Sequence, residues 1–390
     1  MSNIHTYSCQ DISDSDIEAV VSVLRSPHLT QGPATEKFEN DVAAFTGSKF
    51  SVAFNSATSA LHATLSCLNV KEGSIVWTTA NTFAATANAA LYCGATVDFV
   101  DIDQNSLNIS LEALEKKLIA SRLKGCLPDV VIPVHFAGNP ACPEKLYQLS
   151  KDYNFLIVED ASHAFGSKFH CGMIGKCDYS DACIFSFHAV KPVTAGEGGA
   201  VTSNNDLLSK QLKLFRSHGI TRERDIQKNN DHFSKHSWFY QQIMLGFNYR
   251  MSDLHAALGS SQILRATEFC NKRNELAKLY QKQLSGEKIV FQQITSNAIS
   301  AYHLMTLQFE NESARDGVNE YLIKNKVGTN LHYIPVYRHP YYQSLKFADT
   351  FLENTERYYR TALSVPLHTK LEERDVIFIA NLIKEKLTDD

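Results

Sequence analysis

The chain of 390 residues lacks the marks of several large classes of protein. Its formal net charge is −4 and it has no Lys/Arg cluster, whereas nucleic acids and anionic membranes are bound by basic surfaces. No apolar run approaches the ~20 residues of a transmembrane helix. The first residues have neither the basic flank nor the apolar core of a secretory signal. We therefore expect a cytoplasmic protein with no nucleic-acid partner and no membrane partner.

Cysteine is present, but its spacing is typical of neither a metal site nor a disulfide framework. The chain has nine cysteines, and an odd number excludes complete pairing within one chain. A chain of this length also builds its core without covalent cross-links. Cys171, Cys177 and Cys183 are six residues apart, which is not the CxxC spacing of zinc sites. We expect reduced thiols and no bound metal.

Short apolar segments alternate with helical patterns in the first two thirds of the chain. The segments are residues 51–54, 74–78, 96–100, 129–135 and 155–160. Strands that are buried on both faces have this character, and their alternation with helices predicts an α/β fold with a mostly parallel sheet. Ligands of such sheets bind at the carboxyl ends of the strands. This rule points to Thr58, Asp160 and the segment after Cys183.

The pattern changes at about residue 262. A long amphipathic helix is predicted over residues 262–284. The remainder contains predicted strands at 301–309 and 328–333 and predicted helices at 314–325 and 372–387. We therefore divide the chain into a large α/β domain, residues 1–261, and a smaller α+β domain, residues 262–390, which includes the long helix.

The most informative stretch surrounds Lys191. A predicted strand leads into a polar turn, a single lysine, a glycine-rich loop (residues 196–199) and another strand. A lysine in such an apolar and glycine-rich setting can have its pKa lowered by desolvation, and its free amine can then form an imine. The alternative is an ordinary solvated lysine of a turn.

Two further stretches carry weaker signals of the same kind. Asp160 ends a buried strand, where a carboxylate can pair with the pyridine nitrogen of pyridoxal phosphate, or can simply cap a following helix. Residues 55–61 place small hydroxyl residues between a strand and a helix. The N–H groups of such a turn bind phosphate, although an ordinary N-cap has the same composition. The motifs GxGxxG and GxxxxGK[ST] are absent, so neither a dinucleotide fingerprint nor a P-loop is present.

In the order phosphate turn, acidic strand end and lysine loop, these stretches resemble the DegT-type family of sugar aminotransferases. The resemblance extends over nearly the whole chain, and further matching stretches are residues 29–33, 82–88, 159–164, 186–199, 216–219 and 248–253. Members of that family are fold type I enzymes that depend on pyridoxal 5'-phosphate. The resemblance therefore implies an aspartate-aminotransferase-like fold, with a large domain that binds the cofactor and a smaller C-terminal α+β domain.

The resemblance also implies which residues hold the ring of the cofactor. Lys191 matches the lysine that binds the cofactor as an imine, and Asp160 matches the partner of the pyridine nitrogen. Phe83 matches the aromatic residue that stacks on the ring. His163 lies where the family has a Gln or a His in contact with the ring hydroxyl.

Other matching residues concern the phosphate. Thr58, Ser59 and Ser186 match the phosphate ligands, and Ala57 departs mildly from a family that often has glycine there. Asn248 matches a residue that reaches the phosphate from the neighbouring subunit. The resemblance thus implies a homodimer with shared active sites.

A narrower resemblance concerns the substrate. Residues 331–342, 54–61 and 245–250 are similar to aminotransferases of pseudaminic-acid biosynthesis. Those enzymes take the amino group of L-glutamate and place it on C4 of a UDP-linked 4-keto-6-deoxy-N-acetylhexosamine, which forms UDP-4-amino-4,6-dideoxy-N-acetyl-β-L-altrosamine. His332 and Tyr333 either touch the sugar nucleotide or pack between domains.

Three alternatives stay open. Another nucleotide-linked keto-sugar can be the acceptor: a dTDP-4-keto hexose, a 3-keto hexose or a bacillosamine-type UDP-sugar. The chain can also be a non-catalytic regulatory protein that binds pyridoxal phosphate. Relatives that dehydrate sugars have histidine in place of Lys191, so the lysine favours amino transfer.

Overall fold

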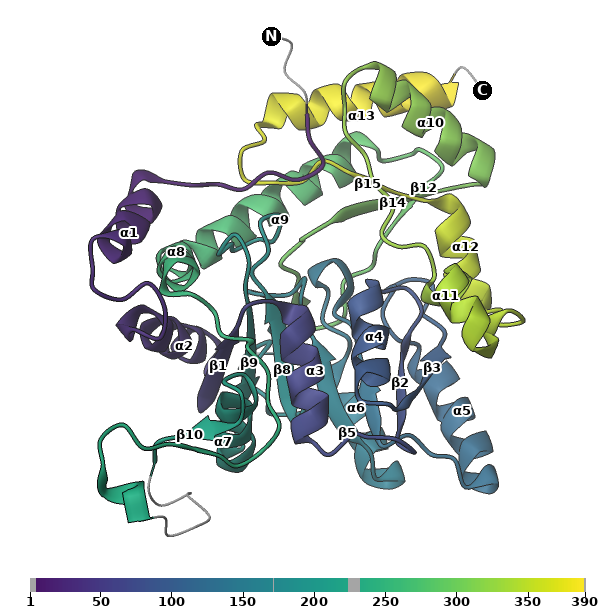
Figure 1. Cartoon of the computed structure of the whole chain (residues 1–390). Coiled ribbons are helices and arrows are strands. Elements are labelled where there is room, and N and C mark those ends of the chain that lie inside the picture. Colours follow the sequence, from purple (N-terminus) through teal and green to yellow (C-terminus); the bar gives the residue numbers. More distant parts are fainter. Residues whose placement is uncertain (1–4, 171, 224–231, 389–390) are drawn as a thin grey trace.

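The computed structural model describes residues 5–170, 172–223 and 232–388, and its centre is a seven-stranded sheet (Figure 1). The strands are ordered β1-β9-β8-β5-β4-β2-β3. Their bounds are β1 (Phe50–Phe54), β2 (Ile75–Thr79), β3 (Thr96–Val100), β4 (Val130–Ile132), β5 (Leu156–Asp160), β8 (Ala182–Ser186) and β9 (Gly199–Ser203). Strands β3, β2, β4, β5 and β8 pair in parallel, whereas β9 pairs antiparallel with both β8 and β1. The predicted α/β class with a mostly parallel sheet is confirmed.

Helices cover both faces of this sheet. Their bounds are α2 (Pro33–Thr46), α3 (Ala57–Cys67), α4 (Ala84–Tyr92), α5 (Leu111–Lys124), α6 (Pro143–Tyr153), α7 (Asp206–Phe215) and α8 (Asp253–Ile263). Val130 and Ile132 of β4 share a core with α3, α4 and α7, whereas Val131 between them shares a core with α5 and α6. Near β1, helices α2 and α8 cover this second face. Since successive residues of a strand point to opposite faces, burial of both faces explains the uninterrupted apolar segments.

The C-terminal part builds a second core around a three-stranded antiparallel sheet in the order β12-β14-β15. Its elements are α9 (Ala266–Gln283), β12 (Ile289–Phe291), β14 (Met305–Phe309), α10 (Glu312–Lys324), α12 (Glu353–Thr361), β15 (Ala362–Val365) and α13 (Glu373–Thr388). The N-terminal segment joins this part of the molecule. His5 forms a bridge with Val327, and the N–H of Leu367 donates to the carbonyl of Tyr7 (3.2 Å).

Three predicted elements of the C-terminal part differ from the structure. The strand predicted over residues 301–309 begins only at Met305. The helix predicted over residues 262–284 is wrong at its start, because Ile263 ends α8 and α9 begins only at Ala266. Arg265 between them has non-helical dihedrals, and its side chain bonds to Asp11 and Asp16. The strand predicted over residues 328–333 is also wrong.

Residues 328–336 leave the small sheet instead of extending it. Asn330 forms only an isolated bridge with Ser364. Beyond it, the N–H of Tyr333 donates to Asn81 Oδ1 (3.1 Å) and the N–H of Val336 donates to the carbonyl of Ala80 (3.0 Å). These bonds draw the segment onto the loop after β2, which brings Tyr333 to the edge of the large sheet.

The other elements are short or peripheral. They are α1 (Asp14–Leu24), α11 (Pro340–Tyr342), β6 (Lys168–Phe169), β7 (Gly172–Met173), β10 (Ile220–Thr221), β11 (Gln241–Gln242) and β13 (Ala298–Ile299). Within the described ranges, no helix has both the length and the apolar character needed to cross a membrane.

Candidate active site

A cavity of about 460 Å³ lies at the carboxyl ends of β5 and β8. The N-terminus of α3 and the loop after β8 line it from the side of the large sheet, and residues 330–333 line it from the C-terminal part. The predicted site residues in its lining are Thr58, Phe83, Asp160, His163, Ser186, Lys191, His332 and Tyr333. The fold therefore brings most of the predicted residues together in one place.

Lys191 lies in the turn after β8, where its N–H donates to the carbonyl of His188 (2.9 Å). Burial lowers the pKa of its amine from 10.5 to about 8, and the Asp160 carboxylate partly opposes this shift. A much larger fraction of Lys191 is therefore neutral near pH 7 than of a solvated lysine. The neutral amine is the form that attacks a carbonyl carbon.

The carboxylate of Asp160 is buried at the end of β5 and is held by two donors. Thr86 Oγ1 donates to Asp160 Oδ2 (2.6 Å), and the N–H of Ser162 donates to Oδ1 (3.0 Å). Since Thr86 uses its proton here, Thr82 Oγ1 is the donor in the 2.7 Å contact between the two threonines. The alternative role as a helix cap is not observed, because residues 161–167 contain turns and no helix. Thr86 is a site residue that the sequence analysis did not single out.

The N-terminus of α3 forms the phosphate turn, residues 55–59, at another side of the cavity. Ser56 is the N-cap and accepts from the N–H of Ser59 (3.2 Å). Thr58 and Ser56 line the cavity. The Ser59 hydroxyl instead lies 2.5 Å from Asn55 Oδ1, so it braces the turn from within. A Cβ at Gly199 would lie 2.5 Å from the carbonyl carbon of Ser56, which explains glycine at this close approach.

Both ring nitrogens of His163 have partners inside the protein. The N–H of Ala137 donates to His163 Nδ1 (3.2 Å), so this nitrogen carries no proton. In the neutral ring the proton is then on Nε2, which donates to Tyr333 Oη (2.9 Å). Burial, together with the positive charge of Lys191, holds the pKa of His163 well below 6.5. His163 therefore stays neutral and directs the hydroxyl proton of Tyr333 away from itself.

Two more buried histidines line the same cavity. His332 Nδ1 lies 2.8 Å from Ser364 Oγ, and burial and Lys191 lower its pKa to about 4. His303, which the sequence analysis missed, has its ring 4.5 Å from that of His163. Its Nδ1 is buried without a hydrogen-bond partner among the described residues. A histidine between Tyr302 and Leu304 in the strand predicted over residues 301–309 was the signal that marked it.

Two of the predicted site residues, Phe83 and Asn248, are exposed. Phe83 is the N-cap of α4, and its side chain lines the cavity although it is 62% exposed. Asn248 is exposed and does not line this cavity; it forms a bridge with Ser217 at the C-terminal end of α7. Asn248 therefore does not contribute to the cavity of its own chain.

The profile of the DegT/DnrJ/EryC1/StrS aminotransferase family matches residues 10–384. The chain belongs to this family. It is therefore a transaminase that depends on pyridoxal phosphate, and the match covers both the large sheet and the C-terminal part.

Similar proteins of this aminotransferase family match along their whole length. UDP-4-amino-4,6-dideoxy-N-acetyl-beta-L-altrosamine transaminase of Campylobacter jejuni is 37% identical over 382 residues, which are 97% of this chain and 96% of that protein. The structure of PseC from Helicobacter pylori, an aminotransferase involved in the biosynthesis of pseudoaminic acid, superposes with a TM-score of 0.89 and 31% identity over 100% of both chains. A putative sugar aminotransferase of Streptococcus pneumoniae in its PLP form has a TM-score of 0.88 and 27% identity, with 99% of each chain covered.

The residues of the cavity fit the cofactor of the aminotransferase family. Lys191 supplies an amine of lowered pKa, and Asp160 supplies a buried carboxylate that is already oriented by Thr86. The N-terminus of α3, with Thr58 at the cavity wall, supplies N–H groups and a hydroxyl for a phosphate. The aldehyde, the pyridine nitrogen and the phosphate of pyridoxal phosphate thus each have a counterpart.

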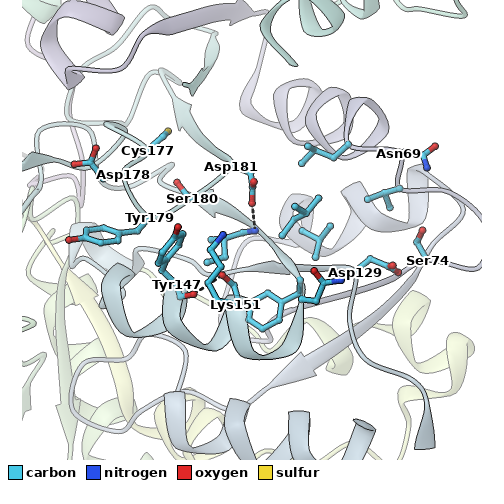
Figure 2. Close-up of a pocket in the computed structure, with 18 of the residues that line it drawn as sticks. Asn69, Ser74, Asp129, Tyr147, Lys151, Cys177, Asp178, Tyr179, Ser180 and Asp181 are labelled. Carbon is cyan, nitrogen blue, oxygen red and sulfur yellow. Dashed lines mark hydrogen bonds between the residues drawn. The ribbon is translucent and has the colours of Figure 1, made fainter. Parts of the chain in front are cut away.

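A larger cavity of about 680 Å³ lies away from these residues, at the amino ends of β4, β5 and β8 (Figure 2). Two of its carboxylates accept hydrogen bonds from the backbone of the sheet, and a third, Asp178, pairs with Lys176. Asp181 Oδ2 accepts from the N–H of Ile157 (2.8 Å), and Asp129 Oδ2 accepts from the N–H of Ile75 (2.7 Å). These two carboxylates accept from N–H groups near the starts of β5 and β2. None of the predicted site residues lines this larger cavity.

Proposed function

We propose that the protein transfers the amino group of L-glutamate to C4 of a UDP-linked 4-keto-6-deoxy-N-acetylhexosamine, which yields UDP-4-amino-4,6-dideoxy-N-acetyl-β-L-altrosamine. The observation that carries the transfer chemistry is the convergence of Lys191, Asp160 and the N-terminus of α3 on one cavity. Similarity to the Campylobacter transaminase over 97% of the chain supports the choice of sugar.

Lys191 moves the proton in this proposal. Pyridoxal phosphate, when bound, supplies the electron sink that stabilises a carbanion at Cα of the amino donor. The neutral amine of Lys191 takes the proton from Cα as a general base and returns it as a general acid. Its pKa of about 8 suits both steps, because a group with a pKa near the working pH exchanges protons in either direction. The two substrates use the cavity in turn, which predicts ping-pong kinetics.

The other residues hold the reacting groups. Asp160, oriented by Thr86, keeps the pyridine nitrogen protonated, and Phe83 covers one face of the ring. Thr58 and Ser186 bind the phosphate together with the N–H groups of α3. Ser59 has a bracing role, since its hydroxyl points to Asn55.

The remaining polar groups are assigned to the ring hydroxyl and the sugar. We assign His163 to the side of the cofactor that carries the ring hydroxyl. It acts there together with Tyr333, to which its Nε2 donates. His332 and Tyr333 contact the sugar nucleotide. The support for this assignment is that both line the cavity and that the segment which carries them is held to the large domain at Asn81.

We further propose a homodimer in which Asn248 of each chain reaches the phosphate site of the other. The exposure of Asn248, outside the cavity of its own chain, supports this arrangement. We also propose that the chain divides into two domains at residue 261 and that the protein is located in the cytoplasm. Light scattering of the purified protein tests the dimer, and a monomer that is fully active at assay concentration would contradict it.

A panel of nucleotide sugars tests the choice of acceptor. Each sugar is incubated with L-glutamate and the enzyme, and the amino sugar formed is identified by mass spectrometry and by NMR at C4. The proposal predicts the highest kcat/KM for the UDP-linked 4-keto-6-deoxy-N-acetylhexosamine. Preference for a dTDP-4-keto hexose, a 3-keto hexose or a bacillosamine-type UDP-sugar would replace the acceptor. Absence of turnover with every sugar would contradict all of these acceptors and leave another keto substrate for the transaminase.

A further inference from the structure

Strand β1 lies at the edge of the large sheet, and side chains pair with its outward backbone groups. Its inner side pairs with β9. On the outer side, the N–H of Ala53 donates to Glu39 Oε1 (2.9 Å), and Arg216 Nη1 donates to the carbonyl of Ala53 (2.5 Å). Arg216 Nη1 also donates to Glu39 Oε1. At Ala53, an ion pair therefore takes the place of a neighbouring strand.

The two side chains come from helices on opposite sides of the strand end. Glu39 belongs to α2, which lies beside β1, and Arg216 is the C-cap of α7 (Figure 1). The Glu39 side chain is only 8% exposed. A buried ion pair is favourable only when hydrogen bonds satisfy its remaining donors and acceptors. The backbone of Ala53 supplies one donor and one acceptor for this purpose.

The backbone of Arg216 contacts the same strand end by a second route. The N–H of Tyr249 donates to the carbonyl of Arg216 (2.9 Å), and the N–H of Asn55 donates to the carbonyl of Tyr249 (2.8 Å). Arg216 is thus bound to Ala53 through its side chain and to Asn55 through Tyr249. These bonds close a ring, and the ring fixes the direction in which the chain leaves β1.

Asn55 is the first residue of the phosphate turn. We propose that Glu39 and Arg216 are positioning residues for this turn: by fixing Ala53 and Asn55, they direct the N-terminus of α3 toward the cavity that holds Lys191. Neither side chain lines that cavity, so both act through the backbone. The inference rests on the proposed function, in which this turn binds the phosphate of the cofactor.

A comparison of two forms of the cofactor tests the role. Pyridoxal phosphate and pyridoxal, which lacks the phosphate, are titrated by visible absorption into the apoenzyme of the wild type and of Arg216→Met. In the variant we expect the dissociation constant of pyridoxal phosphate to rise about tenfold, as for the loss of one charge-assisted hydrogen bond, and that of pyridoxal to change less than about twofold. Inorganic phosphate should also raise the melting temperature of the wild type more than that of the variant.

Lys213→Met is the matched control. Lys213 lies on α7 one turn before Arg216, and its Nζ is 3.9 Å from Glu39 Oε2, but it has no hydrogen bond to Ala53 among the described contacts. We expect this variant to bind both forms as the wild type does. Arg216→Lys and Glu39→Gln are the conservative variants if Arg216→Met does not fold. Glu39→Gln keeps an oxygen for the N–H of Ala53, so it should lose less affinity for pyridoxal phosphate than Arg216→Lys does.

The outcomes distinguish a failure of this inference from a failure of the proposed function. Equal weakening of pyridoxal phosphate and pyridoxal in the folded variants would show a general structural role and overturn the inference. A wild type that binds pyridoxal as tightly as pyridoxal phosphate would overturn the phosphate assignment itself, and the inference with it. A selective loss for pyridoxal phosphate with an unchanged Lys213→Met supports both.

Discussion

Replacement of Lys191 by methionine should stabilise the protein when the cofactor has been removed. The native pKa of Lys191 is about 8 and the ordinary value is 10.5, a difference of about 2.5 pKa units. At about 1.4 kcal/mol per unit, burial of the charged amine costs about 3–4 kcal/mol at neutral pH. Methionine has nearly the same length and carries no charge, so Lys191→Met should raise the free energy of unfolding by about that amount at pH 7.

The gain should depend on pH in a defined direction. Between pH 8 and 10.5 the unfolded chain keeps the proton on Lys191 while the native chain releases it, so the stability of the wild type rises with pH in this window. The difference between Lys191→Met and the wild type should therefore be largest below pH 8 and should fade toward pH 10.5. Urea unfolding of the two apoproteins, followed by circular dichroism at several pH values, measures it.

An exposed lysine serves as the control for this experiment. The pKa of Lys176 is raised by its hydrogen bond to Asp178, so its charge is present in both states near neutral pH. Lys176→Met should therefore not raise the free energy of unfolding at pH 7, and it should show no gain that disappears above pH 8. If Lys191→Met were less stable than the wild type at pH 7, or if its gain stayed constant up to pH 10.5, the assignment of a desolvated Lys191 would be refuted.

Three further predictions concern turnover. Lys191→Ala should abolish transamination, and measurable turnover in a cofactor-loaded sample would remove Lys191 from its role as base. Asp160→Asn should retain much of the cofactor by absorption but lose most of kcat, so unchanged kinetics would exclude the proposed pairing with the pyridine nitrogen. Thr86→Val should lower kcat about tenfold, because it removes a buried hydrogen bond to a carboxylate, whereas Thr86→Ser should keep most of the rate. A Thr86→Val rate equal to that of the wild type would show that the hydroxyl is dispensable.

The parts of the site that follow from strand ends could be predicted from the sequence. Asp160 and the lysine loop come directly after buried parallel strands, and the carboxyl ends of such strands meet at one edge of the sheet. Thr58 follows β1 in the same way, because β1 runs antiparallel to β9 and therefore in the direction of the other strands. The family resemblance then assigned a role to each of these residues.

Other parts depend on contacts that one sequence does not encode locally. Thr86 and His303 reach the cavity through packing between segments that are far apart in the chain. Ser59 and Thr58 have similar side chains, and only the geometry of the N-cap decides which one faces the cavity. The strand predicted over residues 328–333 does not form, because hydrogen bonds to the loop after β2 draw this segment away from the small sheet.

The visible absorption spectrum of the cofactor-loaded enzyme tests the central claim most directly. We predict that L-glutamate alone makes the visible band of the bound cofactor fade, with release of one 2-oxoglutarate per site. The UDP-linked 4-keto-6-deoxy-N-acetylhexosamine, added after removal of glutamate, should then restore the band. A band that does not respond to L-glutamate would contradict the proposed donor, and a faded band that the keto-sugar does not restore would contradict the proposed acceptor.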